Sequence, residues 1–590
     1  MKLKVNRNTL WSKIFIDQLA HLGVKYACIS PGSRSTPLTY AISQNKKIKS
    51  YIHFDERSSA FFGLGIAKVT RIPGLIITTS GTAVAELFPA IIEAYQQRVP
   101  LIICTADRPP ELIGTGANQT INQHNIYKNH IRWFRDLGLP SISETGLRHL
   151  QRMAIKAFKI SSLEDIGPVH LNFPFRKPLE HFSYTDEINK KIFTIKPQRV
   201  LKERIENLRP STQLAAKLAP DLIKYERGII LVGPMDYDHE VIKRVKQLSS
   251  MLKYPIIADG LSQLRIGNSN KEKNILSNFN AIVKSENFIQ KHDPEIIIQY
   301  GRTPTSSAIE HFLENTKAKR YLINSFGDNF DPTRNAKAVF AVSPKNFCHS
   351  LFDYLSDVGL KRTSTIWLKD YLKGEAVCNS SKIKLIEKAN YLHEPNIITE
   401  VLNSLPSGNN IFIGNSLPVR DLDNFMSSTS KNFKIYFNRG VSGIDGVTST
   451  ALGIASRNKK AILITGDLSF LYDLNALPIA VKYSIPLTIL VINNNGGGIF
   501  QSLPISGKVN RFNEFFVTPH NLEISRLVKS FGIDYHLISN KRKLRSVINK
   551  VLNKNYTSVL EIKTDAVKSV ELRNRYFNEV RKKINKEFSV

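Results

Sequence analysis

The segment 461–498 constrains the fold more than any other part of this chain. It holds two apolar runs that lead into Gly466-Asp467 and Asn493-Asn494, with helical spacing of apolar residues between them at 474–483. This order predicts a strand, a crossover helix and a second, parallel strand, because parallel neighbours need a connection of about a dozen residues or more. We therefore expect Asp467 and Asn494 to lie side by side at the carboxyl edge of one sheet.

The polar groups expected at this edge suit a metal-bound phosphate. The Asp467 carboxylate, the Asn494 amide oxygen and the backbone carbonyl of Gly496 are oxygen ligands of the kind that Mg²⁺ takes while it keeps positions for phosphate oxygens. The glycines at 496–498 allow a phosphate to come close to the backbone. Either half of the motif alone is more typical of an ordinary turn, so the metal site rests on the two halves occurring together.

Strands and helices alternate along the rest of the chain, which predicts an α/β fold of doubly wound parallel sheets. The chain has 590 residues, and a single core stops growing at about 250–300 residues. We therefore expect three domains, at 1–190, 200–365 and 390–590. Charged residues around 181–210 and a polar helical segment at 366–392 are expected to connect them.

Several loops of the first domain should fall at the carboxyl ends of its strands. Strands are predicted at 24–29, 74–78 and 100–104, and helices at 60–69 and 83–97. Glu56 precedes the first of these helices, where an acidic residue has an ordinary role as a helix cap.

Four segments of the first domain are specific enough to be compared with a known family. They read Ser30-Pro-Gly-Ser-Arg-Ser-Thr-Pro-Leu, Thr79-Ser-Gly-Thr-Ala-Val, Thr105-Ala-Asp-Arg-Pro-Pro-Glu-Leu and Gly116-Ala-Asn-Gln-Thr-Ile. With the metal motif, the chain resembles the thiamine-diphosphate-dependent 2-succinyl-5-enolpyruvyl-6-hydroxy-3-cyclohexene-1-carboxylate (SEPHCHC) synthases of menaquinone and phylloquinone biosynthesis. The resemblance is dense at 30–125, resumes at 167–176 and returns at 411–504. Leu468 stands in place of the last glycine of the usual Gly-Asp-Gly motif, and that family also departs from the motif at this position.

The resemblance implies a transferase that decarboxylates 2-oxoglutarate on thiamine diphosphate and adds the four-carbon unit to isochorismate in a 1,4 sense. It implies Mg²⁺ or Mn²⁺ as the metal. It also implies a homodimer or homotetramer, because in this enzyme class the first domain of one subunit meets the third domain of another. The alternatives are another thiamine-diphosphate-dependent 2-oxo acid decarboxylase or acyloin synthase, and a binding protein on the same scaffold. The intact Glu56, Asp467 and Asn494 argue against the binding protein.

The matching positions imply a set of site residues. Glu56 would be catalytic, through a hydrogen bond to the aminopyrimidine ring of the cofactor, and Ile444 would hold the cofactor bent. The implied substrate-binding residues are Ser33, Arg34, Arg108, Gln119, Ser416 and Arg420. The implied cofactor-binding residues are Glu56, Ser416, Arg439, Ile444, Gly466, Asp467, Leu468, Ser469, Asn494, Gly496, Ile499 and Phe500, of which Asp467, Asn494 and Gly496 would bind the metal. Arg176 is a further available cation. Relatives often carry a basic residue or pair near 306–308, so either Arg302 takes that role here or the middle domain contributes less cation.

Composition bounds the remaining function classes. The formal charge of +32 could favour nucleic acid, but basic residues occur in every segment without a stripe interleaved with aromatics, so we expect no nucleic-acid partner. No apolar run reaches the roughly 18 residues that span a bilayer, and the start does not read as a signal peptide. The four cysteines lack CxxC spacing, which fits a reducing cytoplasm. The basic amphipathic helix predicted at 565–590 is interpreted as a solvated surface or an oligomer contact.

Overall fold

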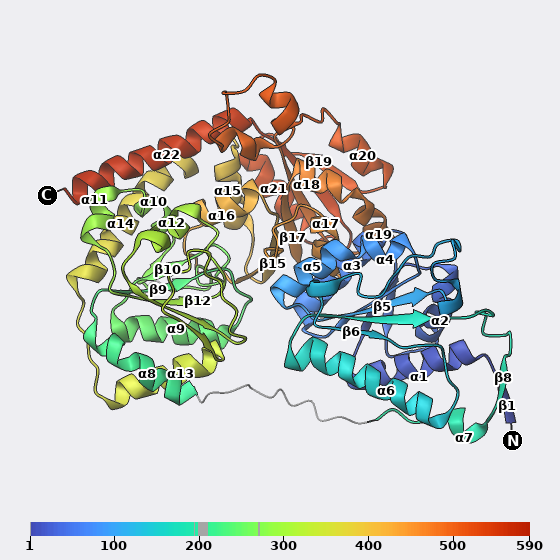
Figure 1. Cartoon of the computed structure of the whole chain (residues 1–590). Coiled ribbons are helices and arrows are strands. Elements are labelled where there is room, and N and C mark those ends of the chain that lie inside the picture. The colour runs from blue at the N-terminus through green and yellow to red at the C-terminus, as the bar shows by residue number, and fades with distance from the viewer. Residues whose placement is uncertain (1, 194, 199–210, 270–271, 459, 590) are drawn as a thin grey trace.

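The computed structural model describes residues 2–193, 195–198, 211–269, 272–458 and 460–589. In these residues it places three six-stranded sheets (Figure 1). Every strand pair within them is parallel, and the central strands β4, β5, β9, β12, β15 and β18 are buried along their whole length, as expected for sheets covered on both faces. The predicted α/β class of doubly wound parallel sheets is confirmed. We call the regions around the sheets the first, middle and third domains, whose boundaries in the sequence stay a prediction.

The first sheet has the strand order β3-β2-β4-β5-β7-β6. Its strands are β2 (Tyr26–Ile29), β3 (Lys49–Ile52), β4 (Gly74–Thr78), β5 (Leu101–Asp107), β6 (Trp133–Asp136) and β7 (Pro168–Pro174). Its main helices are α1 (Arg7–Leu22), α2 (Thr36–Ser43), α3 (Glu56–Thr70), α4 (Thr82–Glu86), α5 (Phe88–Gln97) and α6 (Glu144–Lys159). The single helix predicted at 83–97 is therefore two helices. Pro89 lies in the first turn of α5, where its missing N–H is tolerated and a continuous helix is interrupted.

The middle sheet has the order β11-β10-β9-β12-β13-β14. Its strands are β9 (Gly228–Val232), β10 (Ile256–Ala258), β11 (Ile275–Leu276), β12 (Ile296–Tyr300), β13 (Lys319–Asn324) and β14 (Ala338–Ala341). Helices α8 (Ser211–Lys224), α9 (His239–Leu252), α10 (Phe279–Ile282), α11 (Glu286–Lys291), α12 (Ser307–Asn315), α13 (Pro344–Asp357) and α14 (Ile366–Lys382) belong to this region.

The predicted linker at 181–210 is wrong in its first part. Within it, β8 (Asp186–Asn189) pairs in antiparallel register with β1 (Lys2–Val5) at the N-terminus. The charged composition hid this short two-stranded ribbon, because its strands are mostly exposed. Residues 199–210 of the predicted linker lie outside the described residues.

The third sheet has the order β16-β15-β17-β18-β20-β19. Its strands are β15 (Asn409–Ile413), β16 (Phe433–Phe437), β17 (Ala461–Gly466), β18 (Thr488–Asn493), β19 (Asp534–Leu537) and β20 (Ser558–Lys563). Its helices include α15 (Glu394–Ser404), α16 (Leu417–Phe425), α17 (Val447–Ala455), α18 (Asp467–Tyr472), α19 (Leu477–Lys482), α20 (Ile524–Ser530), α21 (Lys541–Val551) and α22 (Ala566–Glu587).

The predicted pairing of the two strands around the metal motif is present. β17 and β18 are parallel neighbours, with Gly466 opposite Ile492. The connection differs from the single helix predicted at 474–483, since α18 begins directly at Asp467 and α19 begins only at Leu477. Pro478 in the first turn of α19 separates the two helices.

The first and third domains share one hydrophobic core, built around α3 and α17. The two helices touch backbone to backbone. A Cβ added to Gly65 would lie 2.1 Å from the carbonyl oxygen of Thr450, and one added to Gly453 would lie 2.1 Å from that of Phe62. Only glycine allows so close an approach.

The C-terminal helix α22 lies across the third and middle domains (Figure 1). The predicted helix is present, but its interpretation as a solvated surface or oligomer contact is wrong for one face. That face is buried within the chain and packs on α10, α11 and α14 of the middle domain and on α15 of the third. Its buried residues are Ser569, Arg573, Tyr576, Val580 and Ile584.

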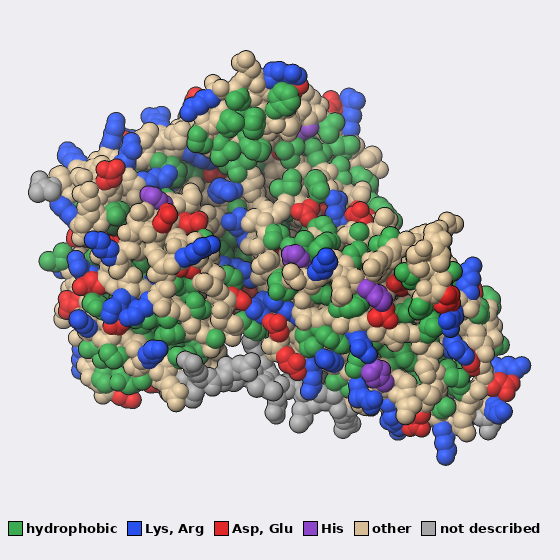
Figure 2. All heavy atoms as spheres, in the orientation of Figure 1, with side chains coloured by type: hydrophobic (Ala, Val, Ile, Leu, Met, Phe, Trp, Pro, Cys, Tyr) green, Lys and Arg blue, Asp and Glu red, His purple; other side chains and the backbone are tan. Residues whose placement is uncertain are grey.

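The basic side chains lie over all three domains. On the face drawn in Figure 2, Lys and Arg are scattered among acidic and apolar side chains and form no single stripe. The net charge is therefore distributed on this face rather than concentrated.

Candidate active site

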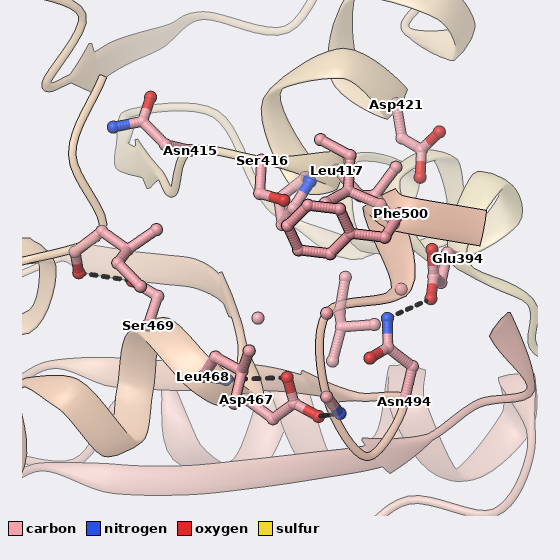
Figure 3. Close-up of a pocket in the computed structure, with 18 residues that line it drawn as sticks. Glu394, Asn415, Ser416, Leu417, Asp421, Asp467, Leu468, Ser469, Asn494 and Phe500 are labelled. Atoms are coloured by element: carbon pink, nitrogen blue, oxygen red, sulfur yellow. Dashed lines mark hydrogen bonds between the residues drawn. The ribbon is translucent and has the colours of Figure 1, made fainter. Parts of the chain in front are cut away.

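A cavity of about 250 Å³ lies at the carboxyl edge of the third sheet, where β17 and β18 end (Figure 3). All its lining residues belong to the third domain. The predicted cofactor residues among them are Ser416, Ile444, Gly466, Asp467, Leu468, Ser469, Asn494, Gly496, Ile499 and Phe500. Glu56 and Arg439 were predicted with them and do not line the cavity.

Asp467 joins the ends of the two strands. Its side chain is 2% exposed. Oδ1 accepts the N–H of Leu468 at 2.7 Å, and Oδ2 accepts the N–H of Gly496 at 2.9 Å. Burial raises the pKa of Asp467, and the two backbone hydrogen bonds oppose that effect because they favour the charged form. The carboxylate is thus fixed in direction at the floor of the cavity.

Asn494 supplies the second oxygen predicted from the sequence. Its Nδ2 donates to Oε1 of Glu394 at 2.7 Å, as the dashed line in Figure 3 shows. Its Oδ1 is buried and has no hydrogen-bond partner among the described residues. A buried acceptor without a partner is costly, so this oxygen is suited to a ligand that the cavity takes up.

The loops above the strands complete the wall. Ser469 donates its hydroxyl to the carbonyl of Ile444 at 2.9 Å, which ties α18 to the glycine-rich loop after β16. Ser416 has φ 68° and ψ −127°, a backbone conformation that side-chain-bearing residues rarely adopt. Its carbonyl accepts a hydrogen bond from Arg420 at 2.7 Å. Desolvation, and then the charge of nearby Arg439, lower the pKa of Arg420.

The predicted substrate residues of the first domain gather at the carboxyl edge of the first sheet, outside this cavity. Arg34 is buried and donates to the carbonyl of Phe175 at 2.6 Å. Burial, and then the charge of Arg108, lower the pKa of Arg34. Gln119 donates to the carbonyl of Ser80 at 3.0 Å. Arg108 donates to the carbonyl of Asn118 at 2.9 Å, and Ser33 begins a short 3-10 helix before α2.

Glu56 is the first residue of α3, and the interpretation of Glu56 as a helix cap is wrong. The cap is Asp55, whose side chain accepts the N–H of Ser58 at 3.0 Å. Glu56 is half-buried, and burial raises the pKa of its carboxyl group. The start of α3 contacts the third domain of the same chain, because Asn475 donates to Asp55 at 2.8 Å.

Two cations named from the sequence are engaged elsewhere. Both nitrogens of the Arg176 fork bind Glu111, at 2.7 and 3.0 Å, in an exposed ion pair outside the cavity. Arg302 lies over the ring of Phe330 in a cleft between the first and middle domains. Arg302 therefore does not extend the cavity of the third domain.

Comparison with known proteins bears directly on this site. Family models described as "Thiamine pyrophosphate enzyme, N-terminal TPP binding domain", "Middle domain of thiamine pyrophosphate" and "Thiamine pyrophosphate enzyme, C-terminal TPP binding domain" match residues 11–126, 202–413 and 424–562. The SEPHCHC synthase of Haloquadratum walsbyi is 34% identical, over 98% of this chain and 99% of its own. Those of Geobacillus kaustophilus and Trichodesmium erythraeum are 35% and 36% identical, over 98% and 95% of this chain and 99% and 96% of their own.

The chain belongs to the SEPHCHC synthase family. Its recognition from the sequence is confirmed, and so is its assignment as a thiamine-diphosphate-dependent enzyme. Among the described residues, no helix combines the length and apolarity needed to cross a bilayer.

The cavity of this SEPHCHC synthase family member fits a metal-bound diphosphate. No group of three or more His, Cys, Asp or Glu side chains among the described residues could hold a metal ion. The oxygens on offer are instead the Asp467 carboxylate and the free Asn494 Oδ1, a hard donor set that suits Mg²⁺. A Cβ added to Gly466 would meet no atom within 4 Å, so the backbone beside Asp467 is open to a ligand.

Three polar side chains of the site were missed in the sequence. Glu394 and Asp421 line the cavity, and His520 directs Nε2 at Asp467 Oδ2 over 3.3 Å. The Nδ1 atom of His520 accepts the N–H of Leu522 at 2.9 Å, which leaves Nε2 as the donor to Asp467 in the neutral ring. None stands in a motif, and only the folding of distant segments brings them together.

Proposed function

We propose that this chain decarboxylates 2-oxoglutarate and adds the resulting four-carbon unit to isochorismate, which forms SEPHCHC. One observation carries the proposal. The Asp467 carboxylate and the unpartnered Asn494 oxygen lie at the ends of adjacent strands in one cavity, in a chain that matches SEPHCHC synthases over 98% of its length. The product would feed the synthesis of a quinone such as menaquinone or phylloquinone.

The cofactor would be held at the carboxyl edge of the third sheet. Asp467, Asn494 Oδ1 and the Gly496 carbonyl would bind Mg²⁺ or Mn²⁺, and residues 466–469 and Ser416 would lie along the diphosphate. When bound, thiamine diphosphate supplies the electron sink for decarboxylation that no side chain can provide. Ile499 and Phe500 add an apolar wall that excludes water from the reacting atoms.

Arginines would recognise the carboxylates of both substrates. Arg34 and Arg108 form one pair of like charges, and Arg420 and Arg439 form another. In each pair burial, and then the neighbouring charge, lower the pKa of one guanidinium, so the carboxylate of a bound substrate would relieve a repulsion between the two cations. The planar fork of arginine suits two-point binding of a carboxylate.

Glu56 would exchange a proton with the aminopyrimidine ring. Burial raises the pKa of its carboxyl group, which makes Glu56 a better proton donor at neutral pH than an exposed glutamate. Glu56 does not line the cavity of its own chain. This supports a site completed by a second subunit, so we propose at least a homodimer, with each Glu56 serving the cavity of its partner.

Turnover with defined substrates tests the function. Purified protein with thiamine diphosphate, Mg²⁺, 2-oxoglutarate and isochorismate is expected to consume both substrates in equal amounts and release CO₂. The same protein with Asp467→Ala should do neither. Turnover of pyruvate without any isochorismate-dependent loss of 2-oxoglutarate would point instead to a general 2-oxo acid decarboxylase.

A further inference from the structure

A buried chain of charges stands behind the second metal ligand of the cavity. Asn494 Nδ2 donates to Glu394 Oε1 at 2.7 Å, and Arg573 Nη2 donates to the other Glu394 oxygen at 2.6 Å. Arg573 also binds Asp421 through Nε at 2.8 Å and through Nη2 at 2.6 Å. We call Asn494, Glu394, Arg573 and Asp421 the Arg573 network.

The Arg573 network joins four segments that are far apart in the sequence. Asn494 follows β18, Glu394 begins α15, Asp421 lies in α16 and Arg573 lies in α22. Glu394 and Asp421 are each 1% exposed and Arg573 is 7% exposed. The third-domain family match ends at residue 562, so Arg573 comes from a helix beyond it.

The charges of the network depend on Arg573. Burial alone would lower the pKa of this guanidinium, but the two carboxylates outweigh that effect and raise the pKa overall. Burial also raises the pKa of Asp421. Without the guanidinium, two buried carboxylates would face each other with no cation between them, which is unfavourable.

The network decides which face of the Asn494 amide meets the cavity. An amide has an oxygen side and an NH₂ side of nearly equal shape, and only the NH₂ side can donate to a carboxylate. Because Arg573 holds the Glu394 carboxyl group in place, a reversed Asn494 amide would place its oxygen against a Glu394 oxygen. The hydrogen bond to Glu394 therefore holds Asn494 Oδ1 toward the cavity, where this oxygen has no hydrogen-bond partner among the described residues.

We propose that Arg573 is a positioning residue for the metal site, which acts through Glu394 to hold the Asn494 oxygen toward the metal. This inference rests on the proposed role of the cavity in binding Mg²⁺ and diphosphate. Partners of this kind behind a metal ligand typically change metal affinity by 10–100-fold when they are removed.

Cofactor binding without substrate provides the test. The variants are Arg573→Lys, which keeps the charge and loses the fork, and Glu394→Gln, which keeps the shape and loses the charge. Arg575→Gln is the matched control, because Arg575 is an exposed residue of the same helix. Calorimetry of thiamine diphosphate binding over a Mg²⁺ series is expected to show an apparent Mg²⁺ affinity about 10–100-fold weaker in both variants and unchanged in the control.

Two further readouts separate positioning from stability. Melting of the cofactor-free protein reports folding, and turnover over the Mg²⁺ series is expected to recover at high Mg²⁺ in the Arg573→Lys and Glu394→Gln variants. Lower melting temperatures with unchanged Mg²⁺ affinity in the folded protein would overturn the inference. If wild-type protein binds cofactor with Mg²⁺ but does not convert 2-oxoglutarate and isochorismate, the proposed function fails and the inference stands.

Discussion

At the scale of the residue, the side chains that spacing could predict are those at the ends of neighbouring strands. Asp467 and Asn494 were found in the sequence because parallel strands joined by one crossover must bring their carboxyl ends together. Glu394 and Arg573 could not be found in this way. Each is an ordinary charged residue in its own segment, and its role arises only where α15, α22 and β18 meet.

Arg34 and Arg176 provide a matched pair of residue-scale predictions. Arg34→Lys removes the fork proposed to hold a substrate carboxylate, and the loss of one charge-assisted hydrogen bond of about 1.5–3 kcal/mol corresponds to roughly 10–100-fold in kcat/KM. Arg176→Lys should change kcat/KM by less than about twofold, because both nitrogens of this exposed guanidinium already bind Glu111 and we assign it no substrate. Steady-state kinetics with each substrate varied in turn measure both. Equal effects of the two variants would remove Arg34 from the proposed site.

At the scale of the element, the strands predicted from apolar runs are present, whereas short edge strands such as β3 and β6 and the interruptions of helices were not predicted. The strand pair at the metal motif is present as predicted, whereas the predicted helices at 83–97 and 474–483 are each broken near a proline. The pattern of α22 revealed an apolar face but not the surface that covers it. Its partners in the middle domain lie about 200 residues or more away in the sequence, and no local signal reports them.

The close contact between α3 and α17 predicts that a single added methyl group lowers the stability of the fold. Gly65→Ala would place Cβ 2.1 Å from the Thr450 carbonyl oxygen, so the two helices must separate. Overpacking of this kind costs about 1–3 kcal/mol. Gly374→Ala in α14 is the control, since its Cβ would first meet a side-chain atom at 3.3 Å and alanine favours a helix. The melting temperature should fall for Gly65→Ala and should stay level or rise for Gly374→Ala.

Asp473, between α18 and α19, predicts a pH dependence of stability. It is fully buried and accepts two hydrogen bonds from Ser449, and burial raises its pKa to about 7. Its unfolded pKa is about 3.9. Protonated Asp473 therefore contributes fully to the free energy of unfolding below about pH 4, and this contribution is lost as the pH rises toward 7.

Asp473→Asn should flatten this dependence. Because the amide does not ionise, the melting temperature of the variant is expected to fall less than that of the wild type between pH 5 and pH 8. The difference corresponds to a few kcal/mol at most, since one pKa unit is about 1.4 kcal/mol. If the melting temperatures of the wild type and the variant changed equally with pH over this range, Asp473 would not be the source of the pH dependence.

At the scale of the whole molecule, we propose that the site is divided between two chains. Glu56 belongs to the first domain and lies outside the cavity, while the metal ligands belong to the third. Sequence resemblance predicted this division. The fold of one chain is compatible with it, because the carboxyl edge of the first sheet carries its own group of arginines apart from the cavity.

Complementation between two inactive variants tests the division. Glu56→Gln and Asp467→Asn should each be inactive as homodimers. A heterodimer isolated with two different tags would hold one intact site and one with both changes, so it should show about half of the wild-type activity. If each site were built from a single chain, every site of the heterodimer would carry one defect. Activity no higher than that of the parents would therefore contradict the proposed exchange.

The position of α22 has a consequence for biosynthesis. Synthesis runs from the N-terminus and early domains fold first, so a growing chain contains the strands of all three sheets before α22 leaves the ribosome. Arg573 arrives last, and it docks on a surface that includes the middle domain. A nascent or truncated chain would thus carry Asp467 and Asn494 without the group that orients Asn494. Only a chain that includes α22 would then bind the cofactor well, and chains that lack this helix would not take up metal and diphosphate.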